Sequence, residues 1–293
     1  MPSSASSATE VTSPVFWKLR AETLGFPRPL AVGIVNVTDD SFFPGARSGT
    51  ADRAIADGLR MAGEGFDMLD VGAVAAQSGQ PVPVADEAAR LVPAIEGLVA
   101  ERRVPIMADT FSAAVAQRAL GAGADAINDI GGGRDPEMLA LAAEAGCGLV
   151  LMHIEGPPRE ERSPRAYADP VEHLKRWFAE RIEAALAHGV RDEQLALDPG
   201  LDFDLSVDDD LTVLRRLGEL RELGRPLFVS LSRKDFLGAV LAGSWAERVP
   251  PEDREWATSA AVTLAVAAGA HLLRLHDRSA LDAMRVAHRI VHG

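Results

Sequence analysis

Polar residues stand at the end of one apolar run after another in this chain of 293 residues. The first run begins at Ala31 and stops at Asn36, and later runs stop at Asp109 and Asp198. If the runs are parallel strands, their carboxyl ends meet at one edge and these residues converge on one polar pocket. Each residue alone is explained as well by capping of the next helix. The strand-end set is Asn36, Asp70, Asp109, Asn128, Asp129, His153, Asp198, Ser232, Arg274 and His276.

Two of these stretches indicate anion binding. Ser232, Arg233 and Lys234 fall at a predicted strand-to-helix turn, where backbone N–H groups and the helix dipole favour an anion. Arg274 and His276 are two residues apart, so they share one face of the last predicted strand. Phosphate sites of parallel barrels often follow the seventh and eighth strands, where both stretches lie. The sequence therefore predicts two anion sites at this end of the barrel.

Asp109, Asn128 and Asp198 offer a different chemistry. Their carboxylate and amide groups provide donors and acceptors for the edge of a flat heterocycle rich in N–H groups. The glycine-rich segments 121–125 and 130–135 lack the strand, spacing and acidic partner of a dinucleotide site. We interpret those glycines as turn residues.

The elements that must position these residues form a regular alternation. Eight short apolar runs are separated by segments with apolar residues three and four apart, which is typical of amphipathic helices. Runs that are apolar on both faces indicate a parallel sheet covered by helices, and eight such units predict a single-domain (β/α)₈ barrel. A doubly wound open sheet is the alternative. The runs span residues 31–36, 68–72, 105–109, 126–130, 148–153, 195–200, 226–232 and 271–276.

Composition limits the partners of this barrel. The net charge of −13 and the absence of a Lys/Arg-rich run argue against nucleic acid and favour a small-molecule ligand. No apolar run is long enough to cross a membrane. Cys147 is the single cysteine, which suits a reducing cytoplasm. The N-terminal residues are small and polar, so we expect 1–28 to be disordered or loosely ordered and 29–293 to form the barrel.

In order and spacing, several motifs are similar to those of the dihydropteroate synthase family. The chain resembles this family from about Leu30 to Val291. The resemblance implies a pterin-binding (β/α)₈ barrel that condenses dihydropterin methyl diphosphate with p-aminobenzoate in folate biosynthesis. It also implies Mg²⁺ as cofactor and a homodimer. The matching stretches are NVTDDSF, LDVG, ADT, INDIGGG, LMH, LDPG, LSRKDFLG and RLHD.

The resemblance implies one set of residues for the pterin. Asp109, Asn128, Asp198 and Lys234 would hold the ring, and Met152 would line its face. Departure of diphosphate from the pterin methylene leaves a delocalised cation. The carboxylates of Asp109 and Asp198 would stabilise that positive charge.

A second set is implied for the other reactants. Asn36, Arg274 and His276 would take the diphosphate, and Asn36 would also reach the magnesium ion. Arg274, His276 and Lys234 would stabilise the leaving anion. Ser232 would stand near the entering p-aminobenzoate.

The chain departs from the family in the loops that close the site. Ala76 and Gln77 replace a Thr and an Arg that help bind diphosphate, and Asp39 replaces a proline. Residues 202–205 replace Gly-Phe-Gly-Lys, and Ser230 replaces a glycine. Three hypotheses follow: a synthase with weak or altered activity, a pterin-binding homologue without synthase activity, and a transferase that uses a different acceptor.

Overall fold

Eight parallel strands form the centre of the molecule. The computed structural model describes residues 15–37, 50–76, 79–160 and 165–293. Neighbouring strands pair in the order β8-β7-β6-β5-β4-β3-β10-β9, and β8 approaches β9 through a single bridge between Leu197 and Leu227. The strands are β3 (Leu30–Asn36), β4 (Met68–Gly72), β5 (Ile106–Asp109), β6 (Ala126–Asp129), β7 (Gly148–Met152), β8 (Leu195–Asp198), β9 (Phe228–Ser230) and β10 (Leu272–Leu275).

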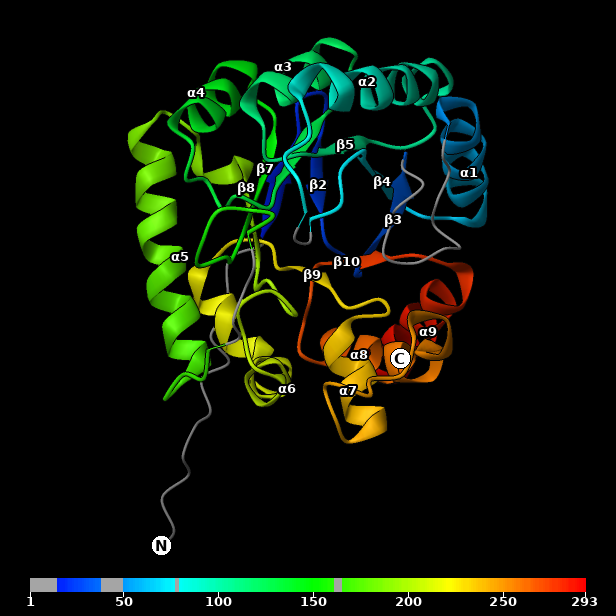
Figure 1. Ribbon diagram of the computed structural model, residues 1–293, viewed down its shortest axis with the longest axis vertical. Coiled ribbons are helices and arrows are strands. Elements are labelled where there is room, and N and C mark those ends of the chain that lie inside the picture. Colours follow the sequence, from blue (N-terminus) through cyan, green and yellow to red (C-terminus); the bar gives the residue numbers. More distant parts are fainter. Residues whose placement is uncertain (1–14, 38–49, 77–78, 161–164) are drawn as a thin grey trace, which may run out of the picture.

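Helices surround this nearly closed barrel on all sides (Figure 1). They are α1 (Ala51–Glu64), α2 (Val84–Glu101), α3 (Ala113–Gly121), α4 (Pro136–Ala145), α5 (Pro170–Ala187), α6 (Val207–Arg215), α7 (Asp235–Ala242), α8 (Glu255–Ala267) and α9 (Arg278–His292). The predicted single-domain (β/α)₈ barrel is confirmed, and the open-sheet alternative is wrong. In the described part of the chain, no helix is both long and apolar enough to cross a membrane.

Local sequence signals explain where the helices start and stop. The Asp135 carboxylate accepts the Glu137 N–H at 2.9 Å, and Pro136 follows it in the first turn of α4. Asp169 caps α5 in the same way ahead of Pro170. In each helix the aspartate accepts a backbone N–H of the first turn. The proline that follows it has no N–H group that would need a hydrogen-bond partner.

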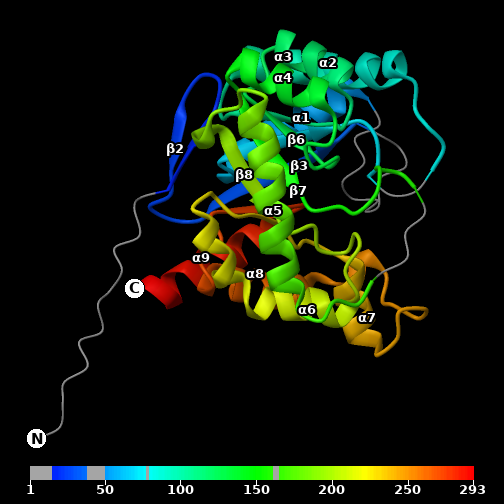
Figure 2. The same cartoon turned by 90° about the vertical axis from the view of Figure 1, so that its left-hand side faces the viewer.

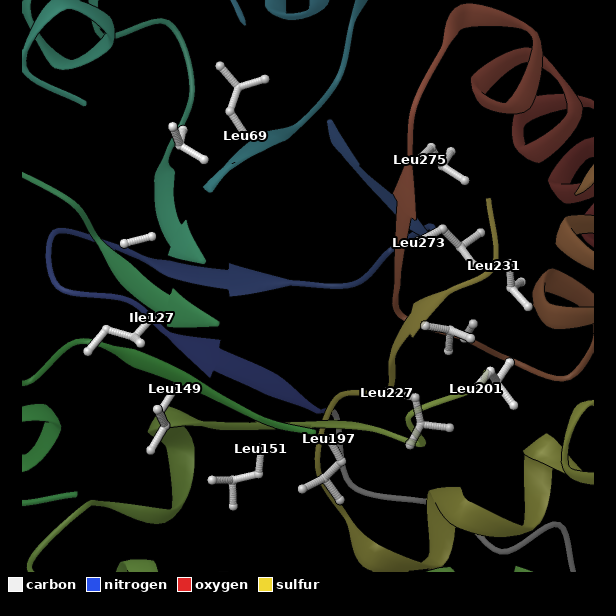
Figure 3. Packing of buried hydrophobic residues seen from close by; sticks show 14 of the residues in the cluster. Leu69, Ile127, Leu149, Leu151, Leu197, Leu201, Leu227, Leu231, Leu273 and Leu275 are labelled. Carbon is white, nitrogen blue, oxygen red and sulfur yellow. The ribbon is translucent and has the colours of Figure 1, made fainter. Parts of the chain in front are cut away.

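The two faces of the strands bury different sets of apolar residues. Leu69, Leu151 and Leu197 point outward and pack in the cluster between strands and helices, part of which Figure 3 shows. Because side chains alternate along a strand, their neighbours point into the barrel. The inner apolar layer consists of Val32, Met68, Met107, Ala126, Val150, Ala196, Phe228 and Leu272.

An N-terminal hairpin closes one end of the barrel. Strands β1 (Phe16–Lys18) and β2 (Thr23–Gly25) pair antiparallel, and Figure 2 shows them (blue) outside one end of the barrel. Trp17 and Leu19 are fully buried against the inner apolar layer, and the Trp17 indole N–H donates to the Gln194 carbonyl at 2.8 Å. The expectation of a loosely ordered segment up to residue 28 is therefore wrong for residues 15–28, because this hairpin supplies the floor of the core.

Candidate functional site

A layer of polar side chains lies directly above the inner apolar layer. Asp70, Asp109, Asn128, Asp198 and Arg274 each follow an inner apolar residue of their own strand by two positions. A strand repeats every two residues, so these five side chains also point into the barrel. The predicted convergence of strand-end residues is observed for this group.

Arg274 is the centre of this polar layer. Its Nε lies 2.5 Å from Asp70 Oδ2, and its Nη2 lies 2.8 Å from Asp109 Oδ2. The Asn128 side-chain amide donates to the same Asp70 oxygen at 3.1 Å. Strands β4, β5, β6 and β10 are thereby joined by one charged network. Asp70, which was not among the residues implied to bind substrate, is fully buried in it.

Burial raises the pKa of two acidic groups of this layer, Asp109 and Asp198. It raises the pKa of Asp109 to about 7; the Asp70 charge adds to this rise and the Arg274 charge opposes it. It raises the pKa of Asp198 to about 6, although the Gly200 N–H, which donates to Asp198 at 2.8 Å, favours the charged form. Carboxylates that titrate in this range respond strongly to a cation or an N–H-rich ring brought beside them.

Lys234 borders the layer from the start of α7. Its Nζ donates to the Leu201 carbonyl at 2.9 Å and stands 4.7 Å from the centroid of the Phe203 ring. Burial lowers its pKa, because the charged ammonium is removed from water. Met152 is the last residue of β7 and packs with Ile130 and Phe203 in a small apolar cluster. An aromatic and apolar face therefore accompanies the charged groups.

Ser232 and His276 meet at the ends of β9 and β10. The His276 backbone N–H donates to Ser232 Oγ at 3.3 Å. Burial, reinforced by the Arg274 charge, lowers the pKa of His276 to about 3. The imidazole is neutral at pH 7, so it would meet an anion as a neutral hydrogen-bonding group unless the anion itself raises that pKa.

The predicted anion site at the start of α7 requires a correction. The N–H groups of Asp235 and Phe236 are already accepted by the carboxylate of Asp202, at 2.7 Å for Phe236. Arg233 is bound to Asp277, with 2.6 Å between Nη2 and Oδ2. In this structure a side chain of the protein fills the place where the turn was expected to receive an external anion.

Comparison with known proteins decides the family. The family model described as "Pterin binding enzyme" matches residues 32–276. The chain belongs to the pterin-binding enzyme family. It is 37% identical over 256 residues to the dihydropteroate synthase of Synechocystis, which covers 87% of each chain. It is 38% identical to the dihydropteroate synthase of Mycobacterium leprae, which covers 89% of this chain and 93% of the relative.

A third relative of this pterin-binding enzyme carries a different description. The "Inactive dihydropteroate synthase 2" of Mycobacterium leprae is 40% identical over 256 residues, which cover 85% of this chain and 86% of the relative. Sequence identity of 38% to the dihydropteroate synthase and 40% to the inactive protein does not show which of the two this chain resembles in activity. Evidence on the activity of this chain must therefore come from its site residues.

Solved structures agree with the family assignment. Dihydropteroate synthase from Xanthomonas albilineans with 4-aminobenzoic acid has a TM-score of 0.85 and 38% identity, and the match covers 96% of this chain and all of the other. The Yersinia pestis enzyme in a sulfonamide complex has a TM-score of 0.87 and 33% identity, covering 94% and 98%. The barrel of this pterin-binding enzyme is therefore superimposable on those of dihydropteroate synthases.

Two predicted members of the polar layer of this pterin-binding enzyme point elsewhere. Asp129 follows Asn128 and so has the opposite side-chain direction, and its carboxylate accepts the N–H groups of Gly131 and Gly133, both at 2.8 Å. His153 follows Met152 and is packed edge-on against Trp177 of α5. The convergence of all strand-end residues was therefore wrong for these two. The interpretation of segment 130–135 as a glycine turn is confirmed.

A cluster beside β7 escaped sequence analysis. Nε2 of His153 and Nε2 of His173 are 3.1 Å apart, and His173 Nε2 is 2.8 Å from Glu155 Oε1. Tyr167 donates to the same Glu155 oxygen at 3.1 Å. The only signal in the sequence was that His153 and Glu155 are two residues apart. His173 lies in the first half of α5, and its spacing from the other two residues gives no indication of the contact.

The loop substitutions are described only in part. Asp39 and Gln77 lie outside the described residues, whereas Ala76 is half-buried beside the apolar cluster of Met152. Asn36 ends β3 opposite Gly72, at the same end of the barrel as the polar layer. Its amide oxygen is a hard donor compatible with Mg²⁺, an ion that commonly takes its other ligands from substrate phosphates and water.

Proposed function

We propose that this protein is a dihydropteroate synthase-type transferase. It condenses dihydropterin methyl diphosphate with p-aminobenzoate, releases diphosphate and so serves folate biosynthesis. The observation that carries the proposal is the charged network of Arg274 with Asp70 and Asp109, next to Asn128. Family membership and the 7,8-dihydropteroate complex of the similar Xanthomonas albilineans enzyme support it.

The polar layer would hold the pterin by its N–H-rich edge. Asp109, Asn128 and Asp198 would bind that edge, Lys234 would donate to a ring acceptor, and Met152 would cover one face. When the bond between the methylene carbon and the diphosphate oxygen breaks, both bonding electrons leave with diphosphate and positive charge spreads over the pterin. The buried carboxylates would stabilise this charge in a low-dielectric site.

The opposite charge would be stabilised at the ends of β3, β9 and β10. Arg274, His276 and Lys234 would bind the departing diphosphate with Asn36. Mg²⁺, held by Asn36 and the phosphate oxygens, would offset the negative charge of the leaving group. The amine of p-aminobenzoate would enter near Ser232, form the new carbon–nitrogen bond and lose a proton.

The setting of the enzyme belongs to the same proposal. A buried, free Cys147 suits a reducing cytoplasm. Exposed apolar side chains on α8 and α9, among them Trp256 and Ile290, suit a homodimer.

A second function is favoured by one specific observation. Asp202 occupies the N–H groups at the start of α7, and Ala76 stands where the family has a threonine. Both changes would weaken anion binding rather than pterin binding. They favour a homologue that binds pterin without synthase activity, as the description of the inactive Mycobacterium leprae relative would suggest. A transferase with another acceptor is the third possibility.

Product analysis separates these functions. Purified protein is incubated with dihydropterin methyl diphosphate, Mg²⁺ and p-aminobenzoate, and both diphosphate and dihydropteroate are quantified. We expect equimolar release of the two products. Diphosphate without dihydropteroate would indicate another acceptor, and pterin binding without either product would indicate the inactive homologue.

A matched pair of variants assigns any activity to the polar layer. Asp198→Asn should lower turnover by about 10²–10³-fold, because it removes a negative charge that would stabilise the developing cation. Asp192→Asn is the control. Asp192 is exposed and lies just before the start of β8, the strand that ends at Asp198. Equal turnover in the two variants would contradict the proposed site.

A further inference from the structure

We propose that His153, Glu155 and His173 form a binding site for Zn²⁺ or a chemically similar divalent cation. Among the described residues, this is the one group of three or more His, Cys, Asp and Glu side chains whose ligand atoms all lie within 4.8 Å of one another. It lies between the end of β7 and α5, on the outward side of the barrel wall. It is separate from the polar layer, which faces inward.

The three ligand atoms already form the triangle that such a cation requires. The Nε2 atoms of His153 and His173 are 3.1 Å apart, and Glu155 Oε1 lies 2.8 Å from His173 Nε2 and 3.5 Å from His153 Nε2. Tetrahedral zinc with bonds of about 2.0–2.1 Å separates its ligand atoms by about 3.3 Å. Each edge of the triangle is within about 0.5 Å of that distance.

Neighbouring residues hold the two imidazoles in this arrangement. His153 is fully buried and packs edge-on against Trp177, with ring centroids 5.1 Å apart. His173 is stacked on Tyr167 at 4.0 Å and 25°. Little side-chain freedom is left to lose when a cation binds, so the geometry favours binding.

The carboxylate is fixed from two directions. The Glu155 backbone N–H donates to Asp204 Oδ2 at 2.8 Å, and its Oε1 accepts the Tyr167 hydroxyl at 3.1 Å. Hydrogen bonds to a ligating carboxylate from surrounding groups are a regular feature of metal sites. A glutamate carboxylate is ionised at neutral pH, as a metal ligand must be.

The donor set selects the cation. Two imidazole nitrogens and one carboxylate oxygen suit zinc and its neighbours, whereas Mg²⁺ and Ca²⁺ prefer oxygen ligands. The side chains of Glu155 and His173 are each 20% exposed, so a fourth position opens toward solvent and can take a water molecule. The bound cation would fasten the segment after β7 to α5.

Metal titration tests the site without any assay of enzyme activity. Protein stripped of metal is titrated with Zn²⁺ by calorimetry, and with Co²⁺ by absorption spectroscopy. We expect one equivalent per chain, the intense visible bands of tetrahedral Co²⁺, and displacement of Co²⁺ by Zn²⁺ but not by excess Mg²⁺. Binding below one equivalent, or octahedral Co²⁺ with weak bands, would overturn the proposal.

Variants tie the signal to these residues. His173→Ala and Glu155→Gln should each weaken Zn²⁺ binding by at least about tenfold to a hundredfold. His188→Ala is the control, because His188 is an exposed histidine just after the same helix. Circular dichroism verifies that each variant is folded. Unchanged binding in both site variants, or an equal loss in the His188 control, would refute the assignment.

Discussion

At the scale of single residues, burial of the Asp198 carboxylate makes its charged form unfavourable for the stability of the folded protein. Asp198 is almost fully buried, and its raised pKa shows that its charged form is less favourable in the folded protein than in water. A pKa shift from 3.8 to about 6 corresponds to about 3 kcal/mol between the two protonation states. The folded state is therefore more stable with Asp198 protonated, whereas the proposed chemistry would use its charged form.

The sign of this effect predicts a pH-dependent stability difference. Because the folded pKa is raised, the stabilising contribution of Asp198 is complete below pH 3.8 and is lost as the pH rises through about 6. Asp198→Asn should therefore exceed the wild type in free energy of unfolding by about 1–3 kcal/mol at pH 8, with little difference at pH 4. Urea unfolding at both pH values measures it. A difference that does not change with pH would contradict the account.

Sequence analysis predicted the direction of a side chain correctly where one strand determines it. Asp109, Asn128 and Asp198 were found because polar groups that end buried runs are conspicuous, and the period of two then places them on the inner face. Asp129 and His153 were misplaced because each is one residue out of phase with that face. His173 was missed because its neighbours come from another element, and only tertiary packing brings them together.

At the scale of elements, the loop after β8 controls the start of α7. Asp202 has a positive φ of 74°, a backbone conformation that glycine adopts most readily. Its carboxylate accepts the free N–H groups of the helix, which takes the role of an external anion. The family glycine at this position would leave those groups open.

Asp202→Gly tests this competition. The variant loses a helix cap, worth about 0.5–2 kcal/mol, but also loses a strained φ of similar cost, so its unfolding free energy should change little. Diphosphate should bind about tenfold more tightly, because two backbone N–H groups become available beside Lys234. Calorimetric titration with diphosphate measures this. Asp208→Ala, at an exposed position in the first turn of α6, is the control. Equal affinities in variant and wild type would argue against the blocking role of Asp202.

Prediction of elements succeeded wherever a run was buried on both faces. All eight barrel strands were located, and the largest difference is at β9, where the run 226–232 contains a strand of residues 228–230. The hairpin escaped because each of its strands has three residues, too few to show an alternating pattern. Its burial depends on Trp17 fitting a floor formed by distant strands.

At the scale of the whole molecule, helices α8 and α9 expose several large apolar side chains. Trp256 is 84% exposed and Ile290 is 75% exposed, and Leu264 and Val286 on the same two helices are more than half exposed. Helices α8 and α9 are in contact with each other. Large exposed apolar side chains on neighbouring helices are typical of an interface between subunits.

Trp256→Glu should convert a homodimer into monomers. A buried tryptophan at an interface is worth about 2 kcal/mol or more, so the dissociation constant should rise by at least about 30-fold. Light scattering after size-exclusion chromatography, over a range of protein concentrations, measures the change. Phe16→Glu, at a half-exposed position on the hairpin, is the control. A monomeric wild type would contradict the proposed dimer.

The floor of the barrel constrains how the chain folds during synthesis. Trp17 leaves the ribosome early, but its hydrogen-bond partner Gln194 is 177 residues further along. At about 5–20 residues per second, the indole waits roughly 10–35 s for that partner. Throughout this interval the apolar side chains of the hairpin have no completed floor to enter, so the nascent protein presents a hydrophobic segment suited to chaperone binding until β8 has been made.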